Sequence, residues 1–207
     1  MQDSTIYEQF PEGMRHCIAF HGHICPGLTY GYLVSKKAIE LLGLQRSKDE
    51  EVVVISENDT CAVDALQVLL GTTLGKGNLI LKDYGKNVFT VFSRKTHRAF
   101  RFSRKESYRY EGEHKAEFEE LEKAFIEGRA TQRQRMRQKW LKTVDLLAKA
   151  FAGVFDLEEI ECPELPYAPL APSEACARCG EMTMATKMVG TKGEKHFCIP
   201  CAQEQGL

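Results

Sequence analysis

Two groups of cysteine and histidine residues in this sequence have the types and the spacing of metal ligands. The C-terminal group contains two Cys-x-x-Cys pairs, Cys176 with Cys179 and Cys198 with Cys201, and eighteen residues separate the pairs. This spacing is typical of zinc ribbons, in which four thiolates surround one zinc ion as a closed tetrahedron. Because a closed shell leaves no position for water or substrate, we predict a structural zinc site. The alternative, a pair of redox motifs, normally requires a thioredoxin-like unit that this sequence does not predict.

The N-terminal group lies in residues 21–27 (HGHICPG), where two imidazoles and one thiol occupy alternating positions. In an extended segment, His21, His23 and Cys25 would point to the same side of the chain. Such a ligand set suits zinc, nickel, copper or iron. The alternative interpretation is a loop with two exposed histidines and a buried free cysteine.

Cys61 adds a thiol at the predicted N-terminus of a helix, where the pKa of a thiol falls and the thiolate becomes available as ligand or nucleophile. Asp59 and Asp64 lie within one turn of it, and helix capping explains either one taken singly. If the fold brings Cys61 next to His23 and Cys25, the result is a mixed nitrogen and sulfur site whose ligands are oriented by carboxylates. Such a site could keep one coordination position open.

Helices and strands must bring these stretches together, and periodicity predicts their order. The predicted helices span residues 12–20, 28–42, 59–70, 113–127 and 131–155, and the predicted strands span residues 52–55, 78–82, 88–93 and 98–103. We expect hairpin connections between the last three strands and close helix packing at Gly31. The apolar stripe along residues 136–151 needs a partner, either the sheet or a second copy of the chain.

This order of elements is not the regular alternation of a doubly wound sheet. We therefore predict an α+β fold: a core of helix, strand and helix, then three strands in a mainly antiparallel or mixed sheet, then long helices and a C-terminal zinc ribbon. The predicted parts are a core domain with the His/Cys site (residues 1–110), a helical extension (111–160), a Pro-rich linker (161–175) and the ribbon (176–207).

Composition and charge narrow the classes of protein. The 207 residues have an average globular composition, and no apolar run approaches the roughly 20 residues of a membrane-spanning helix. The N-terminus lacks the features of a signal peptide, so we expect a cytoplasmic protein with reduced thiols and no membrane partner. A net charge of −1 provides no global attraction to nucleic acid.

A local basic run occupies residues 94–109, and Phe100 and Phe102 alternate with its charges as in some nucleic-acid platforms. Strand alternation explains the same pattern. We favour solvated faces that are paired with acidic residues, such as those of the acidic run from Glu111 to Glu122, and we expect no nucleic-acid partner.

The sequence resembles the family of the E subunit of formylmethanofuran dehydrogenase. The resemblance rests on residues 21–27, on residues 57–64 (ENDTCAVD) and on residues 75–78 (GKGN), and it spans roughly residues 10–109. It implies the same order of elements, a homodimer and, in some members, an added zinc ribbon. Family members look like accessory subunits, so the family name is not an activity.

The resemblance implies a functional group of five residues. They are His21, His23, Cys25, Cys61 and Asp64. We predict that His21, His23, Cys25 and Cys61 hold a second transition metal, which is zinc, nickel or iron. Cys25, Cys61, His23 and Asp64 are the candidate catalytic residues, and Asp64 would orient a ligand or move a proton.

The predicted function is that of a metal-binding accessory protein linked to redox or molybdenum metabolism, with an oxidoreductase complex or a small molecule as its partner. Whether it is an enzyme is left open. The alternative is a zinc-ribbon protein that binds nucleic acid or acts in transcription, and a third hypothesis is a metal chaperone or sensor. Chelator competition distinguishes the third from the first, because a delivery site exchanges its metal faster than a structural ribbon.

Overall fold

The computed structural model describes residues 7–190 and 195–207. Contacts divide the chain into two compact units, Met1–Leu165 and Pro166–Leu207, and each is described by itself. The finer four-part division stays a prediction. Among the described residues, no helix has both the length and the apolar character that crossing a membrane requires.

The first unit combines helices with the strands of one sheet. In chain order its elements are α2 (Glu12–His21), α3 (Pro26–Leu42), β1 (Val52–Ser56), α4 (Ala62–Leu70), β2 (Leu79–Leu81), β3 (Val88–Ser93), β4 (Arg98–Arg104), α5 (Lys115–Ile126), α6 (Gln132–Ala148), α7 (Phe151–Val154) and β5 (Phe155–Ile160). The predicted α+β class with a mixed sheet and long helices is confirmed.

The five strands form one sheet in the order β2-β1-β3-β4-β5, in which only β1 and β2 are parallel. The predicted hairpin between the strands β2 and β3 is therefore wrong, because these strands lie on opposite sides of β1. Asn78 explains the position of β2: its side-chain amide donates to the carbonyls of Asp49 and Val52, each at 2.9 Å. The connection from β3 to β4 is antiparallel, as expected.

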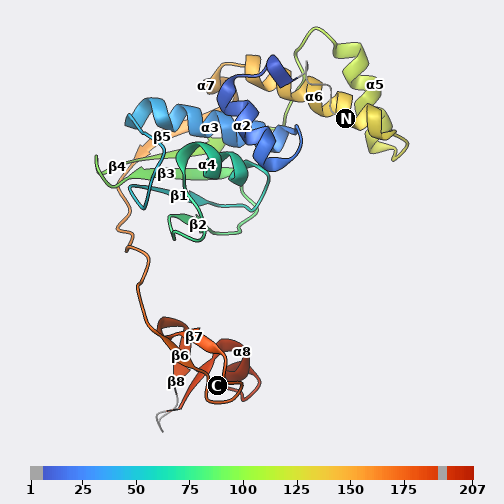
Figure 1. The fold of residues 1–207 in the computed structure, drawn as a ribbon. Coiled ribbons are helices and arrows are strands. Elements are labelled where there is room, and N and C mark those ends of the chain that lie inside the picture. The colour runs from blue at the N-terminus through green and yellow to red at the C-terminus, as the bar shows by residue number, and fades with distance from the viewer. Residues whose placement is uncertain (1–6, 191–194) are drawn as a thin grey trace. The chain divides into compact units, whose positions relative to one another are not determined.

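Helices α2, α3 and α4 lie together over one face of this sheet (Figure 1). Alternate strand residues point toward these helices and form the main core, because side chains of a strand alternate between its faces. The core residues of the three central strands are Val52, Val54, Phe89, Val91, Phe100 and Phe102. Helices α3 and α4 are in very close contact at Gly31, where an added Cβ would lie 2.0 Å from the carbonyl oxygen of Ala62. The predicted close packing at Gly31 is confirmed.

The helix predicted for residues 131–155 is too long. Helix α6 ends at Ala148, because Lys149 and Ala150 adopt extended backbone angles, and strand β5 follows the short α7. The acidic side chains of β5 hide its strand character from the hydrophobic pattern, although Phe155 is buried and Leu157 pairs with Phe102 of β4. The apolar stripe of α6 packs against the cluster around Cys25 and Leu28 at the start of α3.

The second unit is small and consists of short elements. These are β6 (Ser173–Ala175), β7 (Met182–Met184), a 3-10 turn (Ala185–Lys187), β8 (Met188–Gly190), β9 (His196–Cys198) and α8 (Ile199–Gln203). Strands β6 and β7 form one antiparallel pair, and β8 and β9 form another. Its buried cluster contains three cysteines and only a few apolar residues, too few to stabilise so short a segment by hydrophobic burial alone.

Candidate metal centres

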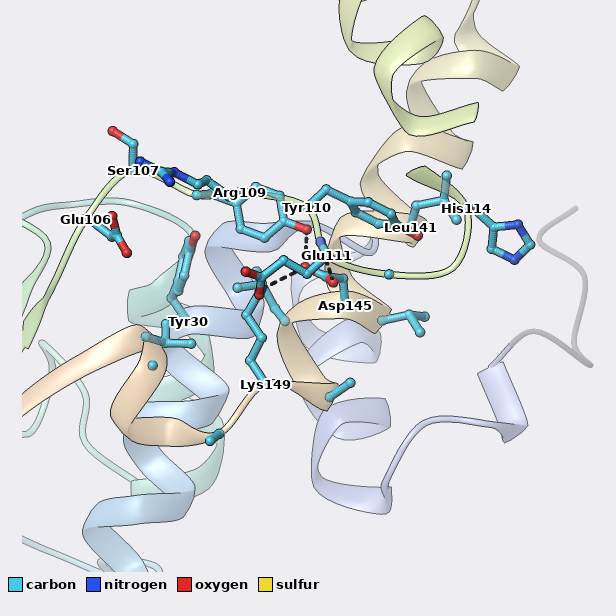
Figure 2. Close-up of a pocket in the computed structure, with 18 of the residues that line it drawn as sticks. Tyr30, Glu106, Ser107, Arg109, Tyr110, Glu111, His114, Leu141, Asp145 and Lys149 are labelled. Atoms are coloured by element: carbon cyan, nitrogen blue, oxygen red, sulfur yellow. Dashed lines mark hydrogen bonds and ion pairs between the residues drawn. The ribbon is translucent and has the colours of Figure 1, made fainter. Parts of the chain in front are cut away.

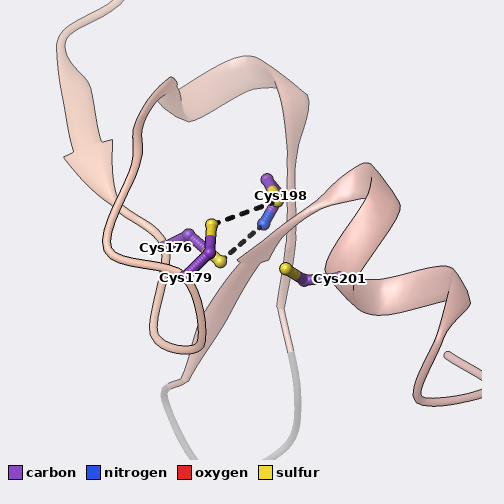
Figure 3. A group of neighbouring side chains, drawn as sticks. All are labelled: Cys176, Cys179, Cys198 and Cys201. Carbon is purple, nitrogen blue, oxygen red and sulfur yellow. Dashed lines mark hydrogen bonds between the residues drawn. The ribbon is translucent and has the colours of Figure 1, made fainter.

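The four cysteines of the C-terminal unit converge on one point (Figure 3). Their sulfur atoms all lie within 4.8 Å of one another. Cys176 follows β6 and Cys179 lies in a turn that ends at Gly180, which has a left-handed backbone angle (φ 75°) that favours glycine. Cys198 ends β9, and Cys201 lies in α8.

Backbone groups around these sulfurs favour the thiolate form. The backbone N–H of Cys198 donates to Sγ of Cys176 at 3.3 Å. Donation from the backbone N–H of Cys179, with those of Cys198 and Arg178, lowers the pKa of Cys176 to about 6. Since the thiolate is the form that binds metals, the donor set fits a tetrahedral thiolate site. The structure therefore provides a four-cysteine cluster that could bind a metal ion.

The N-terminal ligands His21, His23 and Cys25 also converge, and their ligand atoms lie within 4.8 Å of one another. They do so around a helix-turn-helix corner and not in the extended segment that the alternation predicts. His21 is the last residue of α2, Gly22 turns the chain with a φ of 86°, and Cys25 is the N-cap of α3. The amide of Leu28 donates to Sγ of Cys25 at 3.4 Å, which fixes the thiol at the start of that helix.

Asp64 of α4 contacts this group through His21. Its Oδ2 atom lies 2.6 Å from Nδ1 of His21, and Nε2 of the same ring faces Sγ of Cys25 at 3.6 Å. Gln67 donates to the other carboxylate oxygen at 3.2 Å. A carboxylate that holds one ring nitrogen of a histidine, while the other nitrogen faces the ligand group, is the usual arrangement around a metal-binding histidine.

Cys61 is the N-cap of α4 and lies beside Cys25. A Cβ added at Gly27 would lie 3.7 Å from Sγ of Cys61 and 3.9 Å from Sγ of Cys25, so this glycine leaves room for both sulfurs. Cys61 is nevertheless outside the set of three residues whose ligand atoms are mutually close. Its role as a fourth ligand stays a prediction. Asp59 is exposed in the segment before α4 and is not part of this set.

Burial shapes the protonation of this group. Loss of solvent raises the pKa of Cys25 to about 11, and it raises the pKa of the buried Cys17 to about 12. Burial also lowers the pKa of His23, with smaller contributions from His21 and Lys139. Without a metal, the site thus holds a protonated Cys25 thiol and a neutral His23 imidazole. A metal would have to displace the thiol proton, so metal binding at this site should be favoured by higher pH.

Helix α6 covers the His/Cys group, which the sequence did not predict. The hydroxyl of Thr29 donates to Oγ1 of Thr143 at 3.3 Å, and this bond joins α3 to α6. Trp140 and Val144 pack against the buried cluster that contains Cys25. The apolar periodicity of α6 indicates a buried face, but no local signal identifies what that face contacts.

A separate cavity of about 800 Å³ lies beneath the segment that links β4 to α5. Figure 2 shows Tyr110 and Glu111 of this segment above Asp145 and Lys149 of the α6 end. Asp145 holds the segment in place: it accepts a hydrogen bond from the Tyr108 hydroxyl and one from the Glu111 amide. Trp140 also lines the cavity.

The basic run is largely paired within the first unit. Arg98 forms a two-point ion pair with Glu159 of β5, Arg101 pairs with Glu57 and Lys105 pairs with Asp156. Arg94 pairs with Glu50. The run is therefore matched by acidic residues, as predicted, but these lie in β5 and near β1 and not in the acidic run from Glu111 to Glu122. This pairing leaves less positive charge for phosphate groups.

Comparisons with known proteins agree with this architecture. A protein of Archaeoglobus fulgidus, described as a probable S-adenosyl-L-methionine-binding protein, is 32% identical over 190 residues, which cover 88% of this chain and 50% of that protein. This chain thus spans about half the length of that curated relative. The crystal structure of an FmdE-like protein of tungsten formylmethanofuran dehydrogenase, from Syntrophus aciditrophicus, has the same fold, with a TM-score of 0.58, 21% identity, and coverage of 97% of this chain and 94% of that chain.

A family model described as FmdE, Molybdenum formylmethanofuran dehydrogenase operon, matches residues 20–156. The matched region contains the whole His/Cys group, Asp64 and the covering helix α6, and it excludes the four-cysteine cluster. The resemblance that the motifs indicate is confirmed. The chain belongs to the FmdE family.

Proposed function

We propose that this chain is a metal-binding accessory protein linked to redox or molybdenum and tungsten metabolism, with a functional metal at the His/Cys group and structural zinc at the four-cysteine cluster. The observation that carries the proposal is the chain of contacts from Asp64 to His21 to Cys25, at 2.6 Å and 3.6 Å. A histidine that served only to pack α2 would not need a carboxylate on one ring nitrogen and a thiol on the other.

Each residue of the group has a distinct task in this proposal. His21, His23 and Cys25 would bind zinc, nickel or iron, and Asp64 would keep the proton on Nδ1 of His21 so that Nε2 presents its lone pair. When bound, such a metal would supply Lewis-acid chemistry. The apolar residues of α6 would exclude water from one side of the site. Cys61 is either an additional ligand or a nearby thiol that reacts with a bound molecule.

Elemental analysis of the purified chain tests the two sites separately. We expect two metal equivalents in the wild type, one of which is lost in Cys25→Ser and the other in Cys176→Ser. Cys162→Ser is the matched control, because Cys162 is a free cysteine outside both groups and should leave both metals in place. Full metal content in Cys25→Ser would remove the functional site from the proposal and leave only the structural one.

A second candidate function is the binding of S-adenosylmethionine in the cavity beneath residues 104–114. The relative from Archaeoglobus fulgidus is described by this ligand, and the cavity of about 800 Å³ is within the usual size of small-molecule sites. Its lining includes the aromatic rings of Tyr30, Tyr110 and Trp140, on which a purine could stack.

Trp140 allows a direct test, because it is the single tryptophan of the chain and lines the cavity. Binding should change its fluorescence in the wild type. Gly153→Leu should abolish the change: Gly153 lines the cavity, and an added Cβ meets no atom within 4 Å, so the new side chain fills the space without a clash. A flat titration in the wild type would assign the ligand in the relative's description to the half of that protein which this chain does not match.

A further inference from the structure

Lys139 of α6 lies beside the proposed metal site and has no acidic partner among the described residues. Its side chain is half-buried, and no carboxylate lies within ion-pair distance of its ammonium in the described parts of the chain. This sets it apart from Arg98, Arg101 and Lys105, each of which faces a carboxylate. An unpaired ammonium in a half-buried position keeps most of its attraction for anions, because little water screens it.

The register of the two helices places Lys139 near Cys25. Thr143 of α6 is hydrogen-bonded to Thr29 of α3 at 3.3 Å. Cys25 precedes Thr29 by four residues and Lys139 precedes Thr143 by four residues, so each lies one helical turn away on the same face as the bonded threonine. The charge of Lys139 acts on the ionisation of both His23 and Cys25, which agrees with this placement.

The charges of the site leave one positive charge without a partner. A divalent ion and Lys139 would carry three positive charges, whereas the Cys25 thiolate and Asp64 would carry two negative charges. Three protein ligands also leave one position open in a four-coordinate site. Since unpaired charge is costly where water is largely excluded, one monoanion in the open position would both complete the shell and neutralise the group.

We propose that Lys139 makes a monoanion, with an oxygen or sulfur donor atom, the exogenous ligand of the metal held by His21, His23 and Cys25. The inference rests on the proposed function, because it needs a metal at this site. It defines the substrate class of that site: a carboxylate or another small monoanion binds there more tightly than a neutral ligand of similar size. The main competitor for the same position is the thiolate of Cys61, which would also neutralise the group.

Cobalt(II) provides the probe for the test, because its visible absorption responds to ligand exchange. The full-length chain is loaded with cobalt, and the difference spectrum between wild type and Cys25→Ser isolates the His/Cys site from the four-cysteine cluster. Formate and thiocyanate are titrated as anions, and imidazole is titrated as the neutral ligand. Lys139→Met should weaken anion binding roughly tenfold, which corresponds to about 1.4 kcal/mol, and should leave imidazole binding unchanged.

Two further variants separate charge from structure. Lys139→Arg keeps the charge and should bind anions nearly as well as the wild type. Lys142→Met removes a charge from the same helix at a residue that contacts the ring of Tyr108, and it should leave anion binding at the metal unchanged.

Each failure has its own meaning. Equal anion affinity in the wild type and Lys139→Met would overturn the inference while the metal site stands. A wild-type cobalt spectrum that no anion changes would assign the fourth position to Cys61 or another protein group, which also overturns the inference. The absence of any difference between the cobalt spectra of wild type and Cys25→Ser would refute the metal site itself, and the inference with it.

Discussion

Replacement of Asp64 tests the contact on which the proposed metal site depends. Oδ2 of Asp64 lies 2.6 Å from Nδ1 of His21, and the side chains of His21 and Asp64 are 11% and 31% exposed, so solvent weakens this charge-assisted bond only in part. Loss of a carboxylate that orients a metal-binding histidine typically lowers metal affinity by about 10-fold to 100-fold. This range corresponds to roughly 1.4 to 2.7 kcal/mol, similar to the ~1.5–3 kcal/mol of a hydrogen bond to a charged group.

The structure predicts a graded effect of two substitutions. Asp64→Asn keeps an acceptor oxygen near Nδ1 but removes the charge, so we expect metal affinity to fall about 10-fold. Asp64→Ala removes the acceptor as well and leaves the His21 ring free to rotate, so we expect a loss of about 100-fold. Asp59→Asn is the matched control, because Asp59 is exposed in the segment just before α4 and should have no effect.

Competition with a chromophoric chelator measures these affinities in protein whose four-cysteine cluster is already filled. Thermal unfolding followed by circular dichroism checks that each variant is folded. If folded Asp64→Ala binds metal as tightly as the wild type, then Asp64 does not orient a metal ligand, and its bond to His21 only joins α4 to α2.

Three further predictions concern stability. Gly31→Ala should destabilise the first unit by at least ~1–3 kcal/mol, because its Cβ would lie 2.0 Å from the Ala62 carbonyl oxygen, and a denaturant titration measures the loss. Removal of metal from the four-cysteine cluster by a chelator should abolish amide protection in Pro166–Leu207 and leave that of the central sheet unchanged in hydrogen exchange, since metal binding replaces a hydrophobic core there. The hydrogen bond from Ser47 lowers the pKa of Glu51 to about 2, so its charged form stabilises the fold above the ordinary pKa near 4.5 and this contribution disappears as the pH falls toward 2. Wild type and Glu51→Gln should therefore differ in unfolding free energy at pH 7 and converge near pH 2, and a constant difference would contradict the assignment.

Local signals predicted most of the elements around the site. The helices before and after residues 21–27, the buried strand at Val52 and the helix after Cys61 all lie close to their predicted positions. Their signals are turns, caps and apolar periodicity, which depend on residues no more than about one helical turn apart. The two missed features, the parallel pairing of β2 and the strand β5, depend on contacts between residues far apart in sequence.

The candidate sites divide in the same way. Each Cys-x-x-Cys pair is a short segment whose sulfurs are close by covalent geometry, and the nearness of His21, His23 and Cys25 follows from their spacing around one turn. The convergence of the two Cys-x-x-Cys pairs was inferred from a spacing known in zinc ribbons. By contrast, the motif of residues 57–64 indicated a functional aspartate without indicating that it contacts His21 and not another ligand.

Local sequence was enough to establish which residues carry ligand atoms and which of them are close neighbours along the chain, because backbone geometry limits short segments to few shapes. The folded structure was needed to show that Asp64 contacts His21, that Cys61 lies beside Cys25, and that α6 brings Lys139 and Trp140 to the same site. Many pairs of apolar faces have similar hydrophobicity, so the choice of partner is made by the shape and packing of the whole core, which no local pattern contains.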